Sequence, residues 1–210
     1  MKCILCVQSR SGIIWISKDR NLKIKERKLK GVFEISLEPH IDGRGFFMRT
    51  FDQKLFREAG LKQEWVQENH ARSDKKNIIR GLHFQLPPHS ETKMVRCVSG
   101  EILDVFVDLR KNSGTFGQWD SIELSAENKR MILIPRGFAH GYRTLTDVSE
   151  VLYKVDNYYN PNSECGIMWD DDDLNIDWKI GEDENYYLSE KDKFNISFKE
   201  FVSKYKFMDI

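Results

Sequence analysis

The chain has 210 residues, enough for one domain with a substantial buried core. Its 33 Lys and Arg residues balance 33 Asp and Glu residues, so no net charge indicates nucleic acid or a membrane surface as a partner. An aromatic content of 12% excludes a disordered chain. No apolar run approaches the ~20 residues that span a bilayer, and the N-terminal segment CILCV is too short for a signal peptide. We therefore expect a cytoplasmic protein.

Residues 1–30 have the character of an N-terminal extension. Within them, SKDRNLKIKERKLK (17–30) is basic and polar, and neither a strand nor a helix pattern organises it. Cys3 and Cys6 have the C-x-x-C spacing of some zinc and redox sites. No second C-x-x-C or paired histidine follows, so we interpret both as ordinary reduced thiols.

The sequence pattern changes at Gly31. GVFEISLEP (31–39) alternates like a half-buried strand, and DQKLFREAGL (52–61) predicts a short helix that stops at Gly60. Short segments rich in β-branched and aromatic residues follow, separated by Gly, Pro, Asn and Ser at the spacing of sandwiches and barrels. These predicted strands are EWVQENH (64–70), NIIRGLHFQ (77–85), KMVRCVSGEILDVFVDLR (93–110), WDSIELSA (119–126), RMILIP (130–135), AHGYRTL (139–145) and EVLYKVDNYY (150–159).

The order of these elements predicts a mainly β fold, an antiparallel jelly-roll barrel with a few short helices, because no alternation of strand and helix appears. Ser99 and Gly100 lie between two strand runs and predict a hairpin turn. Near the C-terminus, KEFVSKYKF (199–207) has the pattern of an amphipathic helix, with Phe201 and Val202 near one face.

His83 interrupts an apolar strand. On a regular strand it shares a face with Ile79, Gly81 and Gln85, and Gly81 leaves space beside the imidazole for a ligand. Arg80 then points to the other face, unless a bulge at Gly81 re-aims it. The alternative is a core histidine whose hydrogen bonds are satisfied by packing.

Other polar residues break the strand patterns downstream: Lys93, His140 and Tyr153 lie in strand runs, and Tyr158 and Tyr159 precede a proline. Inward polar groups are costly unless the interior is wet or holds a polar ligand. The basic residues and histidines favour an anionic ligand. Taken one by one, each residue also fits a bland role, such as a solvated lysine or a tyrosine that packs its ring.

Seven stretches between residues 43 and 192 carry a resemblance. They are GRGFFMRTF (43–51), VQENHARS (66–73), IIRGLHFQLPPH (78–89), KMVRCVSGEILDVFVDLRKNSGTFGQW (93–119), LSAENKRMILIPRGFAHGY (124–142), LYKVDNYYNPNSECGIMWDD (152–171) and LSEKD (188–192). In this order they resemble the dTDP-4-dehydrorhamnose 3,5-epimerase family of the cupin superfamily. The resemblance implies a cupin-like epimerase domain over 31–192, after the extension 1–30 and before a tail, 193–210, that can form a helix.

The resemblance implies an isomerase that inverts C3 and/or C5 of a nucleotide-diphosphate-linked 4-keto-6-deoxy sugar, without cofactor or metal. The C4 ketone acidifies the hydrogens on C3 and C5, so inversion removes a proton from one face and returns one to the other. The family's roles make His83 the base, Asp192 its partner and Tyr153 the acid on the opposite face. Lys93 matches the cation that stabilises the enolate oxygen.

The resemblance also implies a set of substrate-binding residues: Arg44, Gln67, Asn69, Arg80, His140, Tyr159, Glu164 and Lys191. Arg44, Arg80 and Lys191 suit a diphosphate. In relatives the neighbouring subunit supplies some of these contacts, which implies a homodimer and gives a second explanation for the face of Arg80. The implied partners are the nucleotide-sugar substrate and a second copy of the chain.

One position departs from the family pattern. The family usually has a glutamate on the nucleotide side of the site, where RGFFMRT places Arg49. A carboxylate accepts from thymine N3–H, whereas an arginine only donates, which suits cytosine or guanine. This favours a CDP- or GDP-linked sugar; alternatively Arg49 points to solvent or pairs with a phosphate.

Three rival functions remain at this stage. One is a single-centre epimerase, specific for C5 or C3, on a CDP- or GDP-linked 4-keto sugar. Another is a metal-dependent cupin oxygenase or isomerase, although residues 78–89 hold only His83 and His89 and no H-x-H pair. The last is a sugar-nucleotide binder without catalysis, which needs no acid and base on opposite faces.

Overall fold

The computed structural model describes residues 5–9, 12–17, 22–181, 184–206 and 208. Cys3 and the side chain of Cys6 lie outside the described part, so the interpretation of both as ordinary thiols stays a prediction. None of the described helices is long and apolar enough to cross a membrane.

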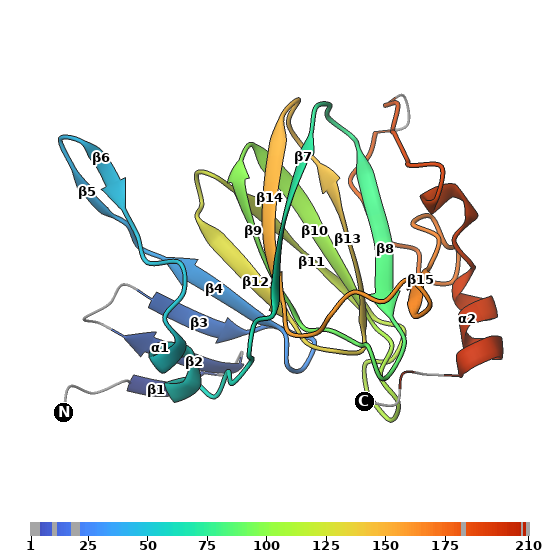
Figure 1. The fold of residues 1–210 in the computed structure, drawn as a ribbon, viewed down its shortest axis with the longest axis horizontal. Helices are drawn as coiled ribbons and strands as arrows, with labels where there is room; N and C mark the ends of the chain where they lie inside the picture. The colour runs from blue at the N-terminus through green and yellow to red at the C-terminus, as the bar shows by residue number, and fades with distance from the viewer. Residues whose placement is uncertain (1–4, 10–11, 18–21, 182–183, 207, 209–210) are drawn as a thin grey trace.

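Two antiparallel sheets form the body of the molecule (Figure 1). The larger sheet contains, in spatial order, β1 (Leu5–Ser9), β2 (Gly12–Ser17), β3 (Leu22–Glu26), β4 (Phe33–Leu37), β12 (Arg130–Ile134), β9 (Lys93–Ser99), β14 (Ser149–Val155) and β7 (Gln67–Ser73). The smaller sheet contains β11 (Trp119–Ser125), β10 (Glu101–Asp108), β13 (Phe138–Thr144), β8 (Ile79–Gln85) and β15 (Glu164–Gly166). The hairpin of β5 (His40–Asp42) and β6 (Gly45–Phe47) and the short helices α1 (Gln53–Glu58), η1 (Asp192–Phe194) and α2 (Phe198–Tyr205) complete the described elements. The mainly β, antiparallel prediction is confirmed.

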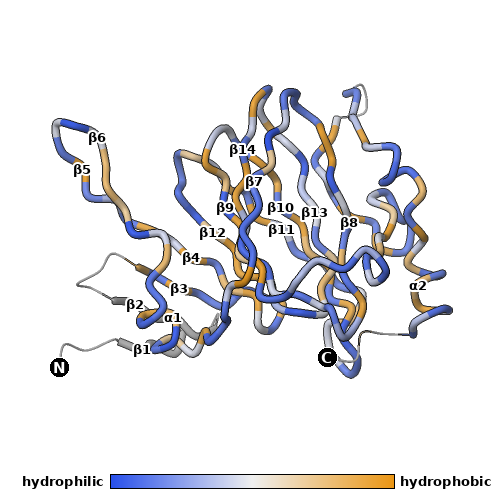
Figure 2. Tube along the Cα trace, in the orientation of Figure 1, coloured by the Kyte–Doolittle hydropathy of each residue, from blue (hydrophilic) through white to orange (hydrophobic). Residues whose placement is uncertain are grey.

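The main core lies between the two sheets. Val95 and Ile132 of the larger sheet pack in one cluster with Phe106 and Phe138 of the smaller sheet, and all four are buried. The strands alternate as expected, since Phe106 faces this core while its neighbours Val105 and Val107 face the opposite side of the sheet. Hydrophobic residues run along the strands of both sheets (Figure 2). Each large side chain buried here contributes about 1.5–3 kcal/mol.

Two further clusters cover the outer faces. The helix α1 begins at the N-cap Asp52, whose side chain accepts from two backbone N–H groups, and it buries Leu55 and Phe56 against β3, β4 and β12. The helix α2 begins with a capping box and places Phe201 in the cluster on the outer face of the smaller sheet. Both predicted helices are therefore confirmed, and α2 belongs to the folded body.

The predicted hairpin at Ser99–Gly100 is wrong. The turn joins β9 of the larger sheet to β10 of the smaller sheet, and the two strands pair with different neighbours. At Gly100 φ is +69°, and a Cβ would lie 2.1 Å from the carbonyl oxygen of Val148. Only glycine fits this close contact, which redirects the chain across the core.

The expectation that residues 17–30 contain no strand is also wrong for their described part. Leu22–Glu26 forms β3 and pairs with β4. Leu22 and Ile24 are buried, whereas Lys23 between them is exposed. The lysines lie on the solvent side of an amphipathic strand, so the high charge of the segment hid its period of two.

A bulge in β8 decides which residues face the space between the sheets. His140 pairs with His83 and Tyr142 with Arg80, so β8 has one more residue than β13 over this interval. Ile79, Leu82 and Phe84 all pack in the outer cluster, and Arg80 and His83 therefore share the inner side. The bulge resolves the conflict over Arg80 within a single chain.

Gly81, at this bulge, does not leave space for a ligand. Its φ is +121°, and a Cβ would lie 2.6 Å from Cα of Gly141 and 2.7 Å from the carbonyl oxygen of His140. The backbone of β13 thus fills the volume beside it. That sequence interpretation is wrong, and the glycine serves the close approach of two strands.

Candidate active site

A cavity of about 170 Å³ lies between the two sheets, at the end where β7 and β14 face β8 and β15. It holds seven of the thirteen residues predicted for the site: Gln67, Asn69, His83, Lys93, Tyr153, Tyr159 and Glu164. They come from both sheets, so the cavity has two chemically different walls.

His83 stands on the wall formed by the smaller sheet. Its Nε2 lies 2.5 Å from Oδ1 of Asp192, a residue 109 positions away in the sequence. The histidine side chain is 29% exposed, whereas that of Asp192 is 3% exposed. Burial acts to raise the pKa of Asp192, but the hydrogen bond and charge of His83 outweigh it and lower that pKa. With Nε2 bonded to the carboxylate, Nδ1 is the ring nitrogen left to take a proton.

Tyr153 and Lys93 stand on the opposite wall. Tyr153 lies on β14 between Val95 of β9 and Asn69 of β7, and Lys93 is the first residue of β9. Burial raises the pKa of Tyr153, and the negative charge of Glu91 raises it further. The phenol therefore stays protonated near neutral pH, as a proton donor must. An imidazole and a phenol thus line one cavity from different sheets.

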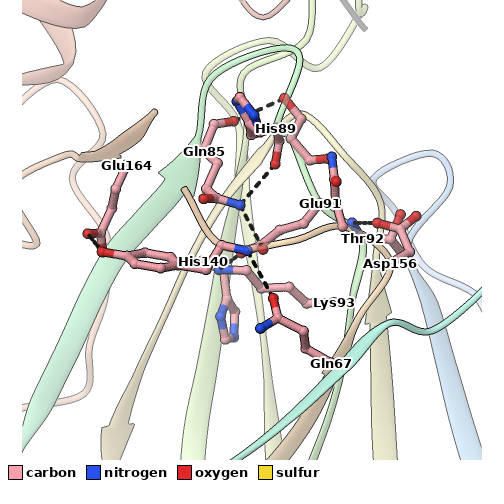
Figure 3. Close-up of polar contacts among 12 residues, drawn as sticks. Gln67, Gln85, His89, Glu91, Thr92, Lys93, His140, Asp156 and Glu164 are labelled. Carbon is pink, nitrogen blue, oxygen red and sulfur yellow. Dashed lines mark hydrogen bonds and ion pairs between the residues drawn. The ribbon is translucent and has the colours of Figure 1, made fainter. Parts of the chain in front are cut away.

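Three polar residues form a chain beside His83. Tyr159 donates to Oε2 of Glu164 over 2.6 Å, and the ammonium of Lys191 contacts the other carboxylate oxygen. Burial acts to raise the pKa of Glu164, but its bonds to Lys191 and Tyr159 lower it. Figure 3 shows Glu164 and Gln67 on two sides of the close-up, with Lys93 between the strands.

Arg80 and His140 lie near the cavity without lining it. Arg80 donates to the hydroxyl of Ser73 and to the carbonyl of Arg72, and so connects β8 with β7 at the rim. His140 is buried, and its Nε2 lies 2.8 Å from Oδ2 of the fully buried Asp104. Burial raises the pKa of Asp104 although the charge of His140 opposes it. This pair lies deeper in the fold than His83.

The described residues contain no group of three or more His, Cys, Asp or Glu that could hold a metal ion. The imidazoles in and beside the cavity each bond to a separate carboxylate, His83 to Asp192 and His140 to Asp104.

Comparisons with known proteins agree with this geometry. The family profile of dTDP-4-dehydrorhamnose 3,5-epimerase matches residues 26–200. The chain belongs to this family. The dTDP-4-dehydrorhamnose 3,5-epimerase of Shigella flexneri is 52% identical over 158 residues, which cover 74% of this chain and 85% of that protein.

Solved structures of the family agree too. The structure of dTDP-6-deoxy-D-glucose-3,5-epimerase from Legionella pneumophila with dTDP-4-keto-L-rhamnose has a TM-score of 0.83 and 37% identity, covering 90% of this chain and 97% of that one. A 3'-monoepimerase from Streptomyces bikiniensis with dTDP-quinovose has a TM-score of 0.78 and 27% identity, covering 87% and 90%. The cupin-like fold and the epimerase class are thus established.

Two residues predicted for this epimerase site lie elsewhere in the chain. Arg44 is in the turn between β5 (His40–Asp42) and β6 (Gly45–Phe47), a hairpin that projects from the body (Figure 1), and it pairs with Asp42. Arg49 donates to Asp52 and borders a separate cavity of about 150 Å³ near α1. A single chain does not bring either arginine to His83.

Two further polar residues that sequence reasoning did not assign also line the epimerase cavity, Gln85 and Glu91. The strand pattern predicted Gln85 on the same face as His83, so its place in the cavity could have been predicted from the sequence. Glu91 lies before β9, which begins at Lys93, so no strand pattern in the sequence covered it. No residue-type pattern marked a glutamate there.

We predict that Asp192→Asn lowers the free energy of unfolding by about 1–3 kcal/mol near pH 7, because it removes the charged partner of His83. A depressed carboxyl pKa contributes stability above its unfolded value and loses it as pH falls through the folded value. The gap between wild type and variant should therefore close below about pH 4. Urea unfolding from about pH 7 to pH 3 measures this, with the exposed Asp172→Asn as control. A gap that stayed constant to pH 3 would contradict the pairing.

Proposed function

We propose that this protein inverts both C3 and C5 of a dTDP-linked 4-keto-6-deoxy sugar by removing and returning protons next to the ketone. The observation that carries the proposal is the position of His83 and Tyr153, which line one cavity from different sheets. The names of the relatives support the substrate class, since the Shigella and Legionella proteins are both named as 3,5-epimerases.

The proton path follows from this arrangement. Nδ1 of His83 takes the proton from C3 or C5, and Asp192 stabilises the imidazolium through Nε2. The electron pair of the broken C–H bond moves into the ring and leaves negative charge on the C4 oxygen. The Tyr153 hydroxyl then returns a proton to the same carbon from the opposite face, and the ketone re-forms. Solvent exchange restores both side chains.

Lys93 is the cation placed to stabilise the enolate oxygen. It is 9% exposed and lies on the wall of Tyr153. A preorganised charge in a site with little water stabilises a developing oxyanion far more than the same charge in bulk water. Its contribution belongs to the transition state, so its loss should lower kcat more than it raises KM.

Two variants separate the steps of this mechanism. We expect His83→Ala to abolish deuterium incorporation from D2O into the sugar while dTDP binding survives. Tyr153→Phe should lower epimerisation by about 10²–10⁴-fold, and lower the initial proton loss less. NMR of the sugar in D2O measures both, and in the wild type it should show deuterium at C3 and at C5. Label at a single carbon would instead favour a single-centre epimerase, and full activity of either variant would remove its assigned role.

The structure changes the argument about the nucleotide. The guanidinium of Arg49 is paired with a carboxylate of its own chain, since it donates to Asp52 over 3.2 Å. An arginine paired in this way is not simply a donor aimed at cytosine or guanine. The Legionella and Streptomyces relatives are also in complex with dTDP-linked sugars. Both points favour dTDP over the CDP- or GDP-linked alternatives.

We predict that turnover of a dTDP-linked 4-keto-6-deoxy sugar exceeds that of the CDP- and GDP-linked sugars by at least about tenfold in kcat/KM. Steady-state assays with the three nucleotides decide this, and Arg49→Ala tests the residue directly. A preference for CDP or GDP that Arg49→Ala removed would restore the earlier hypothesis.

A homodimer is part of the proposal. The β5–β6 hairpin exposes Ile41 (78%), Phe46 (58%) and Phe47 (67%), an apolar surface unlike that of a monomer. The same hairpin carries Arg44 away from the cavity of its own chain. Both observations are explained if the hairpin reaches the cavity of a second copy, with Arg44 near the diphosphate. A twofold dimer makes this exchange mutual.

Mixing two inactive variants tests the shared site. If Arg44 acts in trans, Arg44→Ala and His83→Ala are each impaired, but a mixed dimer has one site with both residues intact. Random mixing should then recover about a quarter of wild-type activity, because half of the dimers are mixed and half of their sites are complete. Co-refolded pairs and a sedimentation measurement check this. A dimer that showed no recovery would place Arg44 outside the partner's site.

We also propose a cytoplasmic location. The described cysteines outside β1, Cys97 and Cys165, are unpaired thiols, which fits a reducing compartment.

A further inference from the structure

Glu91 is the one carboxylate on the cavity wall that carries Lys93 and Tyr153, among the residues that the structure describes. Its Oε1 lies 3.3 Å from the ammonium of Lys93, and its side chain is only 13% exposed. Its Oε2 accepts a hydrogen bond of 3.0 Å from Nε2 of Gln85. Both carboxylate oxygens are therefore directed, one toward a buried cation and the other toward a buried amide.

The backbone between Glu91 and Lys93 is held in place. The N–H of Thr92 donates to Oδ1 of Asp156 over 2.7 Å, and Asp156 also pairs with Arg136. Figure 3 shows Glu91, Thr92 and Lys93 along one segment, with Asp156 bonded to the middle residue. With this residue fixed, the side chains on either side of it point into the same cavity.

Gln85 fixes the far end of Glu91. It is 3% exposed, and besides Glu91 its amide contacts the carbonyls of His89 and Tyr158, while its Oε1 accepts from the N–H of Asn160. A side chain with this many partners has one rotamer. Glu91 is thus clamped between a rigid amide and Lys93.

A buried ammonium needs a counterion, since removing it from water is costly unless an opposite charge is close. Asp104 also lies near enough to Lys93 to feel its charge, but Oδ2 of Asp104 bonds to His140. Glu91 is the carboxylate in direct contact with the ammonium. A long, flexible lysine also loses side-chain freedom when it is held, so a fixed partner reduces the entropy lost at the moment of reaction.

We propose that Glu91 is a positioning residue of the epimerase, which holds the Lys93 ammonium where the enolate oxygen forms. This inference rests on the proposed function of the same cavity. Glu91 contacts Lys93 directly and touches no reacting atom, whereas it acts on Tyr153 only through its charge, so most of its effect should vanish when Lys93 is absent. It should also appear in kcat, because the held charge matters only once the oxyanion develops.

A double-mutant cycle tests this. We expect Glu91→Ala to lower kcat about tenfold with KM nearly unchanged, and Lys93→Ala to lower it about 100-fold. In the Lys93→Ala background, Glu91→Ala should lower kcat by less than about twofold. Glu91→Gln, which keeps the length but not the charge, should fall between wild type and Glu91→Ala. An equal loss in both backgrounds would show that Glu91 acts on its own and would overturn the proposal.

A matched control and a second measurement keep the result clear. Glu68→Gln removes a carboxylate from another Glu–Lys pair, which joins Glu68 of β7 to Lys154 of β14, and it should leave kcat unchanged. Urea unfolding of the wild type, Glu91→Ala, Lys93→Ala and the double variant measures how strongly Glu91 and Lys93 stabilise each other in the absence of substrate. If the wild type turned over no 4-keto sugar, the proposed function would fail, whereas additive midpoints and additive rates in an active enzyme would refute only the role of Glu91.

Discussion

The site depends on one close contact between backbones. Where β8 passes β13, Gly81 and Gly141 approach so closely that a Cβ at either position would collide with the other strand. The extra residue of β8 at this contact reverses its alternation, so that Arg80 and His83 share the inner side. On a regular strand they would face opposite ways, and one of the two would leave the space between the sheets. The close contact of the two glycines thus determines which side chains of β8 face the space between the sheets.

Asp192 joins this contact to the C-terminal part of the chain. Its carboxylate bonds to His83, and the backbone of Gly81 helps to lower the pKa of that carboxylate, so the same side chain lies beside both the imidazole and the bulge. It reaches this position because the segment around α2 is anchored by Phe201, which is fully buried against the outer face of the smaller sheet. The orientation of the imidazole therefore depends on apolar packing on the other side of the sheet.

The sequence predicted what local patterns determine. The helix at Asp52 came from residue periodicity, and the residues His83, Tyr153 and Lys93 came from interrupted strand patterns and from motif resemblance. The turn at Gly100 could not be read locally, because whether two strands pair or separate depends on distant neighbours such as Val148. The bulge at Gly81 and the role of Glu91 were hidden for a related reason, since both depend on side chains or backbone brought together by the sheets.

The two-sheet architecture explains how the proposed acid and base can lie on opposite sides of one sugar ring. Residues on a single sheet face can reach a ligand from one side only, whereas His83 and Tyr153 stand on strands of different sheets. The hydrophobic core between the sheets borders Tyr153. Its packed side chains, such as Phe106 and Val95, set the spacing of the two sheets. Core packing thereby fixes the distance across the cavity. A substitution there would change the separation of the two proton-transfer groups without touching either of them.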